Sequence, residues 1–170
     1  MSDHLIDIVD EDDTVVGADT KTEAQQKGLV HRVVRISLED PLGNILIQKR
    51  QDGKELYPNC WDSAAAGHVD SGESYEQAAE RELYEELGVV TKLREVKYYK
   101  SEGKFGWRML NRVNKLYVVV IPPETSFTLQ KDEVADVQWV SRDELHDLVK
   151  NHPNEVADGL LEVYEIMYKP

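Results

Sequence analysis

The fold is decided by one stretch, Gly67-His-Val-Asp-Ser-Gly-Glu73-Ser-Tyr-Glu-Gln-Ala-Ala-Glu-Arg81-Glu82-Leu83-Tyr-Glu85-Glu86-Leu-Gly88-Val89. Its second half, from Ser74 to Leu87, contains no proline or glycine and is dominated by Ala, Glu, Leu, Gln and Arg, which favour a helix. Ser71 or Ser74 can cap the start of this helix, and Gly88 stands where a left-handed residue commonly ends one. The stretch therefore predicts a helix that follows a glycine-bearing loop.

Three glutamates of the predicted helix, Glu82, Glu85 and Glu86, are spaced i, i+3 and i+4, so their carboxylates share one face. Leu83 and Leu87 form the neighbouring apolar stripe, which should anchor the helix on a core. Like charges this close repel one another, and a hard divalent cation such as Mg²⁺ or Mn²⁺ removes the repulsion. A solvated acidic helix face is the alternative, but the register of the whole stretch favours a metal site.

The fixed positions G-x5-E-x7-R-E-U-x-E-E-x-G-U, with U apolar, are all present between Gly67 and Val89. The segment therefore resembles the catalytic box of the Nudix superfamily. This resemblance implies an α/β/α sandwich with a mixed β-sheet and cleavage of diphosphate linkages with divalent metal ions. It also implies structural roles for Glu73, Arg81 and Gly88, and the backbone carbonyl of Gly67 as a metal ligand beside the glutamates.

Length and composition favour one domain with a proper core, because the chain has 170 residues, of which 41% are hydrophobic and 31% charged. The net charge of −13 gives no positive field for duplex nucleic acid. No apolar run approaches the ~20 residues that cross a bilayer, and the N-terminus lacks the pattern of a secretory signal. The single cysteine, Cys60, excludes an internal disulfide. We expect a single Nudix domain over residues 1–170, located in the cytoplasm.

The rest of the chain predicts strands that are interrupted by one central helix and followed by helices, which favours a mixed sheet with helices on its faces. Predicted strands, separated by turn residues, cover residues 5–9, 14–17, 33–38, 45–49, 93–99, 114–121 and 137–140. The first two form an N-terminal hairpin, residues 5–17, that extends the domain. Helices are expected at 21–27, from the capping box at Ser141 to Val149, and at 155–168. Residues 51–63 and 101–106 are expected to be loops.

Residues outside the box resemble the Nudix branch that is related to isopentenyl-diphosphate isomerase. The matching segments are Ile6–Asp10, Val30–Arg32, Leu46–Arg50, Lys54, Pro58, Trp61-Asp62 and Gly67–Val69. This branch raises a rival reaction, in which proton transfer moves a double bond and needs acid and base groups on both sides of the substrate carbon.

The chain departs from the isomerase pattern at the positions that carry this chemistry. Ala66 stands where the isomerases have a reactive cysteine, and Ala24 replaces a histidine of their second metal site. No Asp or Glu lies between Arg108 and Ile121, where the isomerases place closely spaced glutamates. Cys60 lies too far from Ala66 along the chain to replace the missing thiol and is expected to be structural. Hydrolysis is therefore the expected reaction.

Five polar residues outside the helix are candidates for binding substrate or metal. Arg50 and Lys54 follow a strand end, where the isomerase resemblance implies binding of the outer phosphate; ordinary surface charge is the alternative. His31 and His68 match metal ligands of the isomerases, but without the glutamates we expect hydrogen-bonded or substrate-facing roles. Glu133 matches a position that approaches the metal cluster from a loop in several Nudix groups; a solvated carboxylate is the alternative.

Four aromatic residues, Tyr57, Trp61, Phe105 and Trp107, lie in two loops that flank the predicted site. Stacking on a base is worth roughly 1–3 kcal/mol in nucleic-acid complexes, and these rings offer such a surface. Core packing explains each of them equally well.

The sequence thus predicts a metal-dependent hydrolase of a phosphoanhydride bond in a nucleoside diphosphate or a small molecule linked to one. Glu82 and Glu86 are the expected catalytic residues, and Gly67, Glu82, Glu85 and Glu86 are the expected ligands of Mg²⁺ or Mn²⁺. The alternatives are an isopentenyl-diphosphate isomerase and a non-catalytic nucleotide-binding sensor. The expected partner is a small-molecule diphosphate, without duplex nucleic acid or membrane, and the protein is expected to be a monomer or a homodimer.

Overall fold

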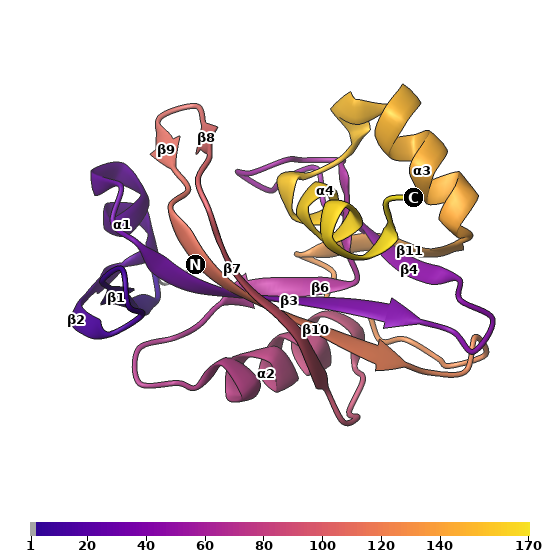
Figure 1. The fold of residues 1–170 in the computed structure, drawn as a ribbon, viewed down its shortest axis with the longest axis horizontal. Helices are drawn as coiled ribbons and strands as arrows, with labels where there is room; N and C mark the ends of the chain where they lie inside the picture. Colours follow the sequence, from indigo (N-terminus) through magenta and orange to yellow (C-terminus); the bar gives the residue numbers. More distant parts are fainter. Residues whose placement is uncertain (1–2) are drawn as a thin grey trace.

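Helices cover both faces of a mixed sheet in the computed structural model, which describes residues 3–170 (Figure 1). The predicted fold class, an α/β/α sandwich, is confirmed. Within the described residues the large sheet has nine strands, and a separate hairpin has two. The strands of the large sheet are β1 (Leu5–Val9), β2 (Val15–Thr20), β3 (His31–Glu39), β4 (Ile45–Arg50), β5 (Trp61–Ser63), β6 (Ala65–His68), β7 (Arg94–Ser101), β10 (Arg112–Val120) and β11 (Val134–Val140).

The long strand β3 lies at the centre of this sheet and sets its geometry. It runs parallel to β10, with Arg112 opposite His31. It runs antiparallel to β6, with Ala66 opposite Arg35, and also pairs antiparallel with β1 and β4. Because side chains alternate along a strand, odd-numbered residues of β3 share one face with even-numbered residues of β6 and β10.

Each face of the sheet carries its own hydrophobic core. Helix α2 (Tyr75–Leu87) covers one face, where Leu83 and Leu87 pack against Val34, Ile36 and Leu38 of β3. The other face is covered by α3 (Arg142–Asn151), a 3-10 turn η1 (Pro153–Glu155), α4 (Asp158–Val163) and a π-helical turn η2 (Tyr164–Tyr168). Figure 1 shows α2 on one side of the sheet and α3 and α4 on the other.

Both ends of α2 are fixed by the residues that the sequence singles out. The Ser74 hydroxyl accepts from the backbone N–H of Gln77 at 3.2 Å, and the Gln77 side chain accepts from the Ser74 N–H at 3.0 Å. Gly88 ends the helix with φ of 70°, in the left-handed region that glycine adopts without strain. Ser71, the other capping candidate, instead donates its hydroxyl to Asp7 at 2.6 Å.

The N-terminal hairpin is tied to the loop that leads into α2. The carboxylate of Asp7 on β1 accepts from the Ser71 hydroxyl and, at 3.2 Å, from the N–H of Gly72. The hairpin was predicted at 5–17 and reaches Thr20, where α1 (Lys21–Lys27) begins. In the part of the chain that the structure describes, no helix is long and apolar enough to cross a membrane.

The prediction of one continuous helix at 155–168 is wrong. Val156 is extended and bridges to Trp61, and the N–H of Ala157 donates to the Trp61 carbonyl at 2.8 Å. This pairing with β5 delays the helix until Asp158, and the chain then changes to π-helical hydrogen bonding at η2. Periodicity in the sequence does not reveal the pairing, because the partner strand is nearly a hundred residues away.

Two segments that were expected to be irregular contain short strands. Within 51–63, β5 pairs with the end of β4. After 101, β8 (Lys104–Phe105) and β9 (Arg108–Met109) form a small hairpin whose Phe105 ring lies 4.7 Å from the ring of Tyr57. Strands of two or three residues are too short for an alternating pattern, so sequence reasoning could not find them.

Candidate active site

Gly67 lies directly against Glu82 of α2. A Cβ built on Gly67 would lie 2.0 Å from Oε1 of Glu82, which is far closer than two non-bonded atoms can approach. The absence of a side chain on β6 therefore provides the space that the Glu82 carboxylate occupies. The packing of α2 on the sheet thus brings together the backbone at Gly67 and this carboxylate.

The three candidate metal ligands on α2, Glu82, Glu85 and Glu86, differ in their exposure. Glu86 is only 5% exposed, whereas the side chain of Glu82 is 14% exposed and that of Glu85 is 47% exposed. The amide nitrogen Nε2 of Gln48, on β4, donates to Oε2 of Glu86 at 2.8 Å. Two of the three carboxylates are therefore held in the interior, and Glu86 has a neutral hydrogen-bond donor.

Burial raises the pKa of both inner glutamates. For Glu82 it raises the pKa to about 7, opposed by the ion pair with Arg81 and supported by the charges of Glu85 and Glu133. Burial and the neighbouring charge of Glu82 raise the pKa of Glu86 well above its ordinary value. Two desolvated carboxylates side by side are not both ionised without a counter-charge, so the cluster favours either a shared proton or a cation.

Arg81 is the cation that reaches this cluster. Its Nε and NH2 donate to the two carboxylate oxygens of Glu73 at 3.0 and 2.9 Å, and NH2 also donates to the His68 carbonyl at 3.0 Å. Its NH1 donates to Oε1 of Glu82 at 2.7 Å and lies 3.5 Å from Oε2 of Glu85. Arg81 therefore connects Glu73, in the loop between β6 and α2, to Glu82 and Glu85 on α2.

A fourth carboxylate approaches from the loop that precedes β11. Glu133 pairs with the ammonium group of Lys54, and its backbone carbonyl accepts from the N–H of Gln51 at 3.1 Å. Its charge contributes to the raised pKa of both Glu82 and Glu86. The structure thus places Glu133 near the glutamates of α2, in the direction that the resemblance implies.

The donor set of the cluster suits a hard divalent cation, since carboxylate and carbonyl oxygens are the ligands that Mg²⁺ and Mn²⁺ prefer. The raised pKa values of Glu82 and Glu86 also fit a cation. In residues 3–170, however, no group of three or more acidic, histidine or cysteine side chains is already arranged around one metal position. Arg81 holds Glu82, and Glu85 is half-exposed. Metal binding therefore requires Glu82 to exchange a guanidinium for the cation.

His31 and His68 lie side by side on the opposite face of the sheet. Their rings stack at 5.2 Å with 21° between the planes, and Nδ1 of His31 donates to the Leu29 carbonyl at 2.9 Å. Burial lowers the pKa of His31 to about 4 and that of His68 well below its ordinary value, so both rings are neutral at pH 7. The neighbouring strand β10 supplies Arg112 and Asn114 on this face. The structure thus brings the histidines together, and Arg112 and Asn114 stand on β10 where the isomerase resemblance implies carboxylates.

Arg50 is largely used to hold the loop between β4 and β5. Its Nε donates to the Leu56 carbonyl at 3.0 Å, and NH1 pairs with Asp62 at 3.0 Å. The geometry favours a structural role for this arginine, and phosphate binding by Arg50 stays a prediction.

Lys54 belongs to a group of cations that sequence reasoning only partly identified. Lys21, at the start of α1, has a pKa lowered by burial and by the charges of Lys54 and Arg108. The side chains of all three residues therefore lie close together, although they come from distant segments. No local pattern marks Lys21, because its position depends on how α1 packs beside β9.

Two of the aromatic candidates pack against each other rather than facing a ligand. Tyr57 and Phe105 are in contact, and Tyr57 has a φ of 50°, which is strained for a residue with a side chain. Trp107 is 52% exposed at the end of β8–β9, with the guanidinium of Arg108 4.3 Å from its ring centre. Trp61, at the start of β5, is partly buried in the core under α3 and α4. Base stacking by Trp107 stays a prediction.

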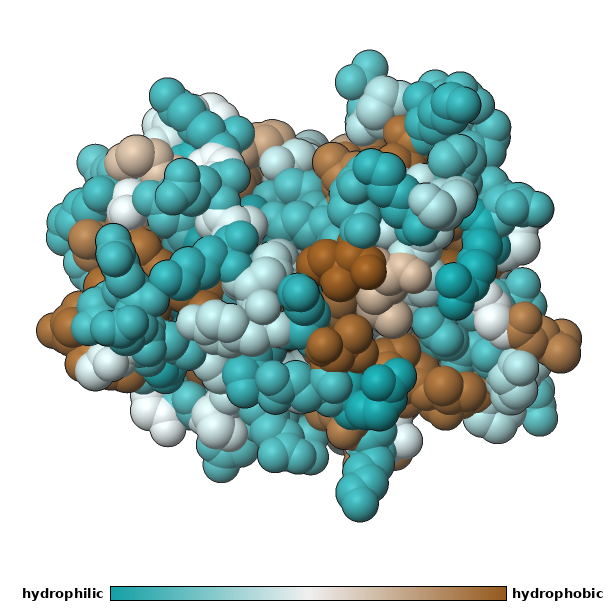
Figure 2. Space-filling view, viewed as in Figure 1, coloured by the Kyte–Doolittle hydropathy of each residue, from teal (hydrophilic) through white to brown (hydrophobic). Residues whose placement is uncertain are grey.

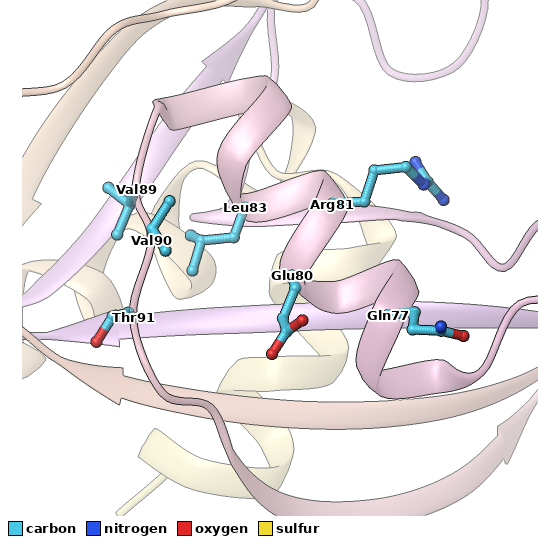
Figure 3. Close-up of a pocket in the computed structure, with 7 residues that line it drawn as sticks. All are labelled: Gln77, Glu80, Arg81, Leu83, Val89, Val90 and Thr91. Carbon is cyan, nitrogen blue, oxygen red and sulfur yellow. The ribbon is translucent and has the colours of Figure 1, made fainter.

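A surface hollow of about 400 Å³ lies beside α2 but is distinct from the carboxylate cluster (Figure 3). It is lined by Gln77, Glu80, Arg81, Leu83, Val89, Val90 and Thr91. In Figure 3 the Arg81 side chain extends away from Val89 and Thr91. The hollow is not lined by Glu82, Glu85 or Glu86, so it adds nothing to the candidate site.

Comparison with known proteins identifies the family. The family model for the NUDIX domain matches residues 29–160. The chain belongs to the Nudix family. Members of this family act on phosphorus-containing acid anhydrides and generally need divalent metal ions such as Mg²⁺ or Mn²⁺.

Individual relatives agree with this assignment. An uncharacterized Nudix hydrolase from Listeria monocytogenes is 38% identical over 122 residues, which are 71% of this chain and 69% of the relative. Isopentenyl-diphosphate Delta-isomerase 2 from Photorhabdus laumondii is 30% identical over 168 residues, 98% of this chain and 89% of the relative. The crystal structure of DR0079 from Deinococcus radiodurans matches with a TM-score of 0.79 and 27% identity, covering 97% of this chain and 99% of that one. The predicted family and hydrolase class are therefore confirmed.

Proposed function

We propose that this Nudix protein hydrolyses a phosphoanhydride bond in a nucleoside diphosphate, or in a small molecule linked to one, with Mg²⁺ or Mn²⁺ as cofactor. The observation that carries the proposal is the burial of two neighbouring carboxylates, Glu82 against Gly67 and Glu86 against Gln48, with both carboxyl pKa values raised. Such a cluster is unfavourable until positive charge enters it, and a divalent metal ion would carry that charge.

Each box residue has a distinct role in this proposal. Glu82, Glu85, Glu86 and the carbonyl of Gly67 would hold the metal. A bound divalent cation neutralises phosphate charge and lowers the pKa of an attacking water. Glu82 would take the proton as the water oxygen bonds to phosphorus and the bond from phosphorus to the bridging oxygen breaks. In the metal-free protein Arg81 holds Glu82 through the 2.7 Å hydrogen bond and is itself fixed by Glu73.

The substrate phosphates would meet cations on the side of the cluster next to Glu133. Lys54 lies there against Glu133, and Lys21 lies beside Lys54. A phosphate that displaces the Glu133 carboxylate from Lys54 would gain an ion pair and free Glu133 to face the metal. His68 is neutral and partly exposed, so it can hydrogen-bond a substrate without adding charge.

The test is a hydrolysis screen over nucleoside diphosphates, nucleoside triphosphates, nucleotide sugars, dinucleoside polyphosphates and coenzymes. Release of phosphate or a nucleoside monophosphate is measured with Mg²⁺, with Mn²⁺ and with EDTA. We expect turnover that requires the divalent ion and is retained in Glu80→Gln, an exposed residue on another face of α2. Absence of turnover across the panel, with nucleotide binding retained, would favour the non-catalytic sensor instead.

The similarity to an isopentenyl-diphosphate isomerase makes double-bond isomerisation the main alternative to hydrolysis. The thiol of Cys60 lies 3.6 Å from the Asn154 carbonyl, and burial raises its pKa, so it is not an activated group. Ala66 has no acid or base function, and Arg112 and Asn114 stand on β10 where carboxylates are needed. We expect no allylic isomer when the protein is incubated with isopentenyl diphosphate and Mg²⁺, and formation of that isomer would overturn the hydrolase proposal.

A further inference from the structure

Four buried side chains on the face of the sheet opposite α2 have polar atoms without partners. They are His31 and Arg35 on β3 and Arg112 and Asn114 on β10, and none is more than 8% exposed. Within residues 3–170, no hydrogen bond reaches His31 Nε2, Arg35 NH2, Arg112 Nε or Asn114 Oδ1. Buried polar atoms are nearly always paired in native proteins, so four on one face require an explanation.

The sheet register gathers these side chains into one cluster. Because β3 and β10 are parallel with His31 opposite Arg112, the alternation of side chains directs all four to the same side. Glu162 of α4 lies over them: it accepts from Nε of Arg35 at 3.0 Å and lies 3.5 Å from NH2 of Arg112. We call His31, Arg35, Arg112 and Asn114 the polar cluster.

The polar cluster has no net charge once its ion partners are included. Arg35 pairs with Glu162, and Arg112 pairs with both Asp158 and Glu162, so two guanidinium groups meet two carboxylates. A further phosphate or carboxylate would meet already neutralised cations next to acidic groups. The site therefore suits an uncharged polar group.

The unpartnered atoms divide into donors and acceptors. Nε2 of the neutral His31 ring is an acceptor, because Nδ1 donates to the Leu29 carbonyl. Asn114 donates its Nδ2 to Ser101 Oγ at 3.0 Å and to two backbone carbonyls at 3.5 Å, which leaves Oδ1 as an acceptor. Arg35 and Arg112 contribute N–H donors. Two donors and two acceptors match the edge of a planar heterocycle that carries both carbonyl and amino or ring N–H groups.

The cluster borders on a partly exposed part of β6. Ala66, Gly67 and His68 all keep partial exposure, and Ala66 lies directly opposite Arg35. Figure 1 shows hairpin β8–β9 and α4 as separate projections above the sheet, and Figure 2 shows the upper outline of the molecule indented between them. Tyr57 from the neighbouring loop is near enough for Asp158 to help raise its pKa to about 12, a shift caused mainly by burial. Gly67 faces Glu82 on the α2 side of the sheet, whereas Ala66 and His68 face the polar cluster on the other side. Among the described residues β6 pairs with β3 alone, so a ligand that reaches both clusters has to pass around the free edge of β6.

We propose that the polar cluster recognises the nucleobase of the substrate, while the diphosphate lies at the glutamates of α2. The inference rests on the proposed function, and it adds which residues recognise the base. Movement of the loop carrying Tyr57 would admit the ring, and the strained backbone of this residue is consistent with a segment held in place by its contact with Phe105.

The test measures binding in EDTA by calorimetry, so that it does not depend on catalysis. The ligands are the four common nucleoside monophosphates, ribose 5-phosphate and glucose 1-phosphate. We expect at least one nucleoside monophosphate to bind tenfold or more tightly than either sugar phosphate. Asn114→Leu should reduce this difference to less than threefold, whereas Lys115→Ala, the next residue on the opposite face of β10, should retain it. If Asn114→Leu does not fold, as judged by circular dichroism, His31→Phe removes the other acceptor and is used in its place.

Several outcomes overturn the inference. They are equal binding of ribose 5-phosphate and all four monophosphates, tighter binding of glucose 1-phosphate, no measurable binding of any monophosphate at millimolar concentration, or a difference that survives in both variants. Failure of the proposed function looks different, because it appears as wild-type protein without metal-dependent hydrolysis. Hydrolysis with a KM for nucleoside diphosphates that Asn114→Leu leaves unchanged would refute base recognition alone.

Discussion

At position 86 a carboxylate is enclosed by the sheet, the helix and the neutral amide of Gln48. Its burial is costly for a charged group, and Glu82 beside it increases the cost, which explains why the pKa of both groups is raised. A structural role alone would be better served by a glutamine or a methionine at this position. The arrangement fits the proposed role of Glu86 as a ligand of a divalent cation.

Glu86→Gln keeps the shape of this side chain and removes its charge. We expect kcat to fall by roughly a hundredfold or more, because a carboxylate ligand of a catalytic metal is lost. The metal-free variant should be at least as stable as the wild type, since the unfavourable buried charge is gone. Steady-state kinetics and thermal melting in EDTA measure both effects. Near-wild-type turnover would remove Glu86 from the mechanism.

Gly67→Ala places a Cβ where the Glu82 carboxylate now lies. We expect a loss of about 1–3 kcal/mol in the free energy of unfolding from overpacking, together with at least a tenfold loss of activity. Gly53→Ala is the matched control, because a Cβ there meets nothing within 4 Å and the residue has no positive φ. Full activity in Gly67→Ala would show that Glu82 can work from another position.

Glu82 makes the stability of the metal-free protein depend on pH. Its pKa is raised from 4.5 to about 7, so between these values the folded state keeps a proton that the unfolded chain has released. Stability contributed by this group is therefore lost as the pH rises through that window. His31, with a pKa lowered to about 4, acts in the opposite direction between pH 4 and 6.5, so a comparison with Glu82→Gln is needed to isolate the effect.

The expected result is that Glu82→Gln gains stability relative to the wild type as the pH rises from 5 to 7.5 in EDTA. Urea unfolding at several pH values measures this difference. A difference that does not change with pH would show that Glu82 titrates normally.

Among the elements, α2 was the best predicted because its information is local. Ser74, Gln77 and Gly88 are close in sequence to the bonds they make, and the i, i+3, i+4 spacing of the glutamates needs only helical geometry. The C-terminal helix was predicted wrongly because its start depends on a contact between Val156 and Trp61. The two predictions differ because α2 is defined by residues close together in the sequence, whereas the start of the C-terminal helix depends on two residues that are far apart in it.

The cap of α2 can be tested as an element. Ser74→Ala removes the hydroxyl that accepts from the Gln77 N–H and should lower the free energy of unfolding by ~1 kcal/mol. Ser74→Asp should restore most of this loss, because aspartate also caps. Chemical denaturation of the three proteins measures the effect. Equal stability of Ser74→Ala and the wild type would show that the helix start is held by tertiary packing instead.

For the whole molecule, the sequence predicted the layers but not the register that joins them. Alternation and turn residues were sufficient to predict a mixed sheet between helices. The parallel pairing of β3 with β10, which sets Arg112 and Asn114 beside the histidines, depends on which of many strands become neighbours. The carboxylate cluster could therefore be predicted from the box, while the polar cluster, Gln48 and Lys21 could not. The single-domain prediction stays a prediction.

A ligand that binds only the folded state stabilises the entire chain. We expect Mg²⁺ at about a hundred times its dissociation constant to raise the Tm by roughly 5–10 °C, using the usual relation between free energy and Tm for a chain of this size. Glu86→Gln should lose most of this increase, whereas Glu80→Gln should keep it. Scanning calorimetry with and without the ion gives the shift. An equal shift in all three proteins would indicate non-specific screening of the −13 net charge.

The hydrogen bond from Arg81 to Glu82 has a consequence for how the protein responds to its surroundings. In the resting protein this guanidinium acts as an internal competitor that an incoming ion must displace. Under the proposed function, the ion concentration that activates the enzyme therefore depends partly on how tightly Glu73 holds Arg81. Weakening that ion pair would change the sensitivity to the ion without removing any of the proposed metal ligands.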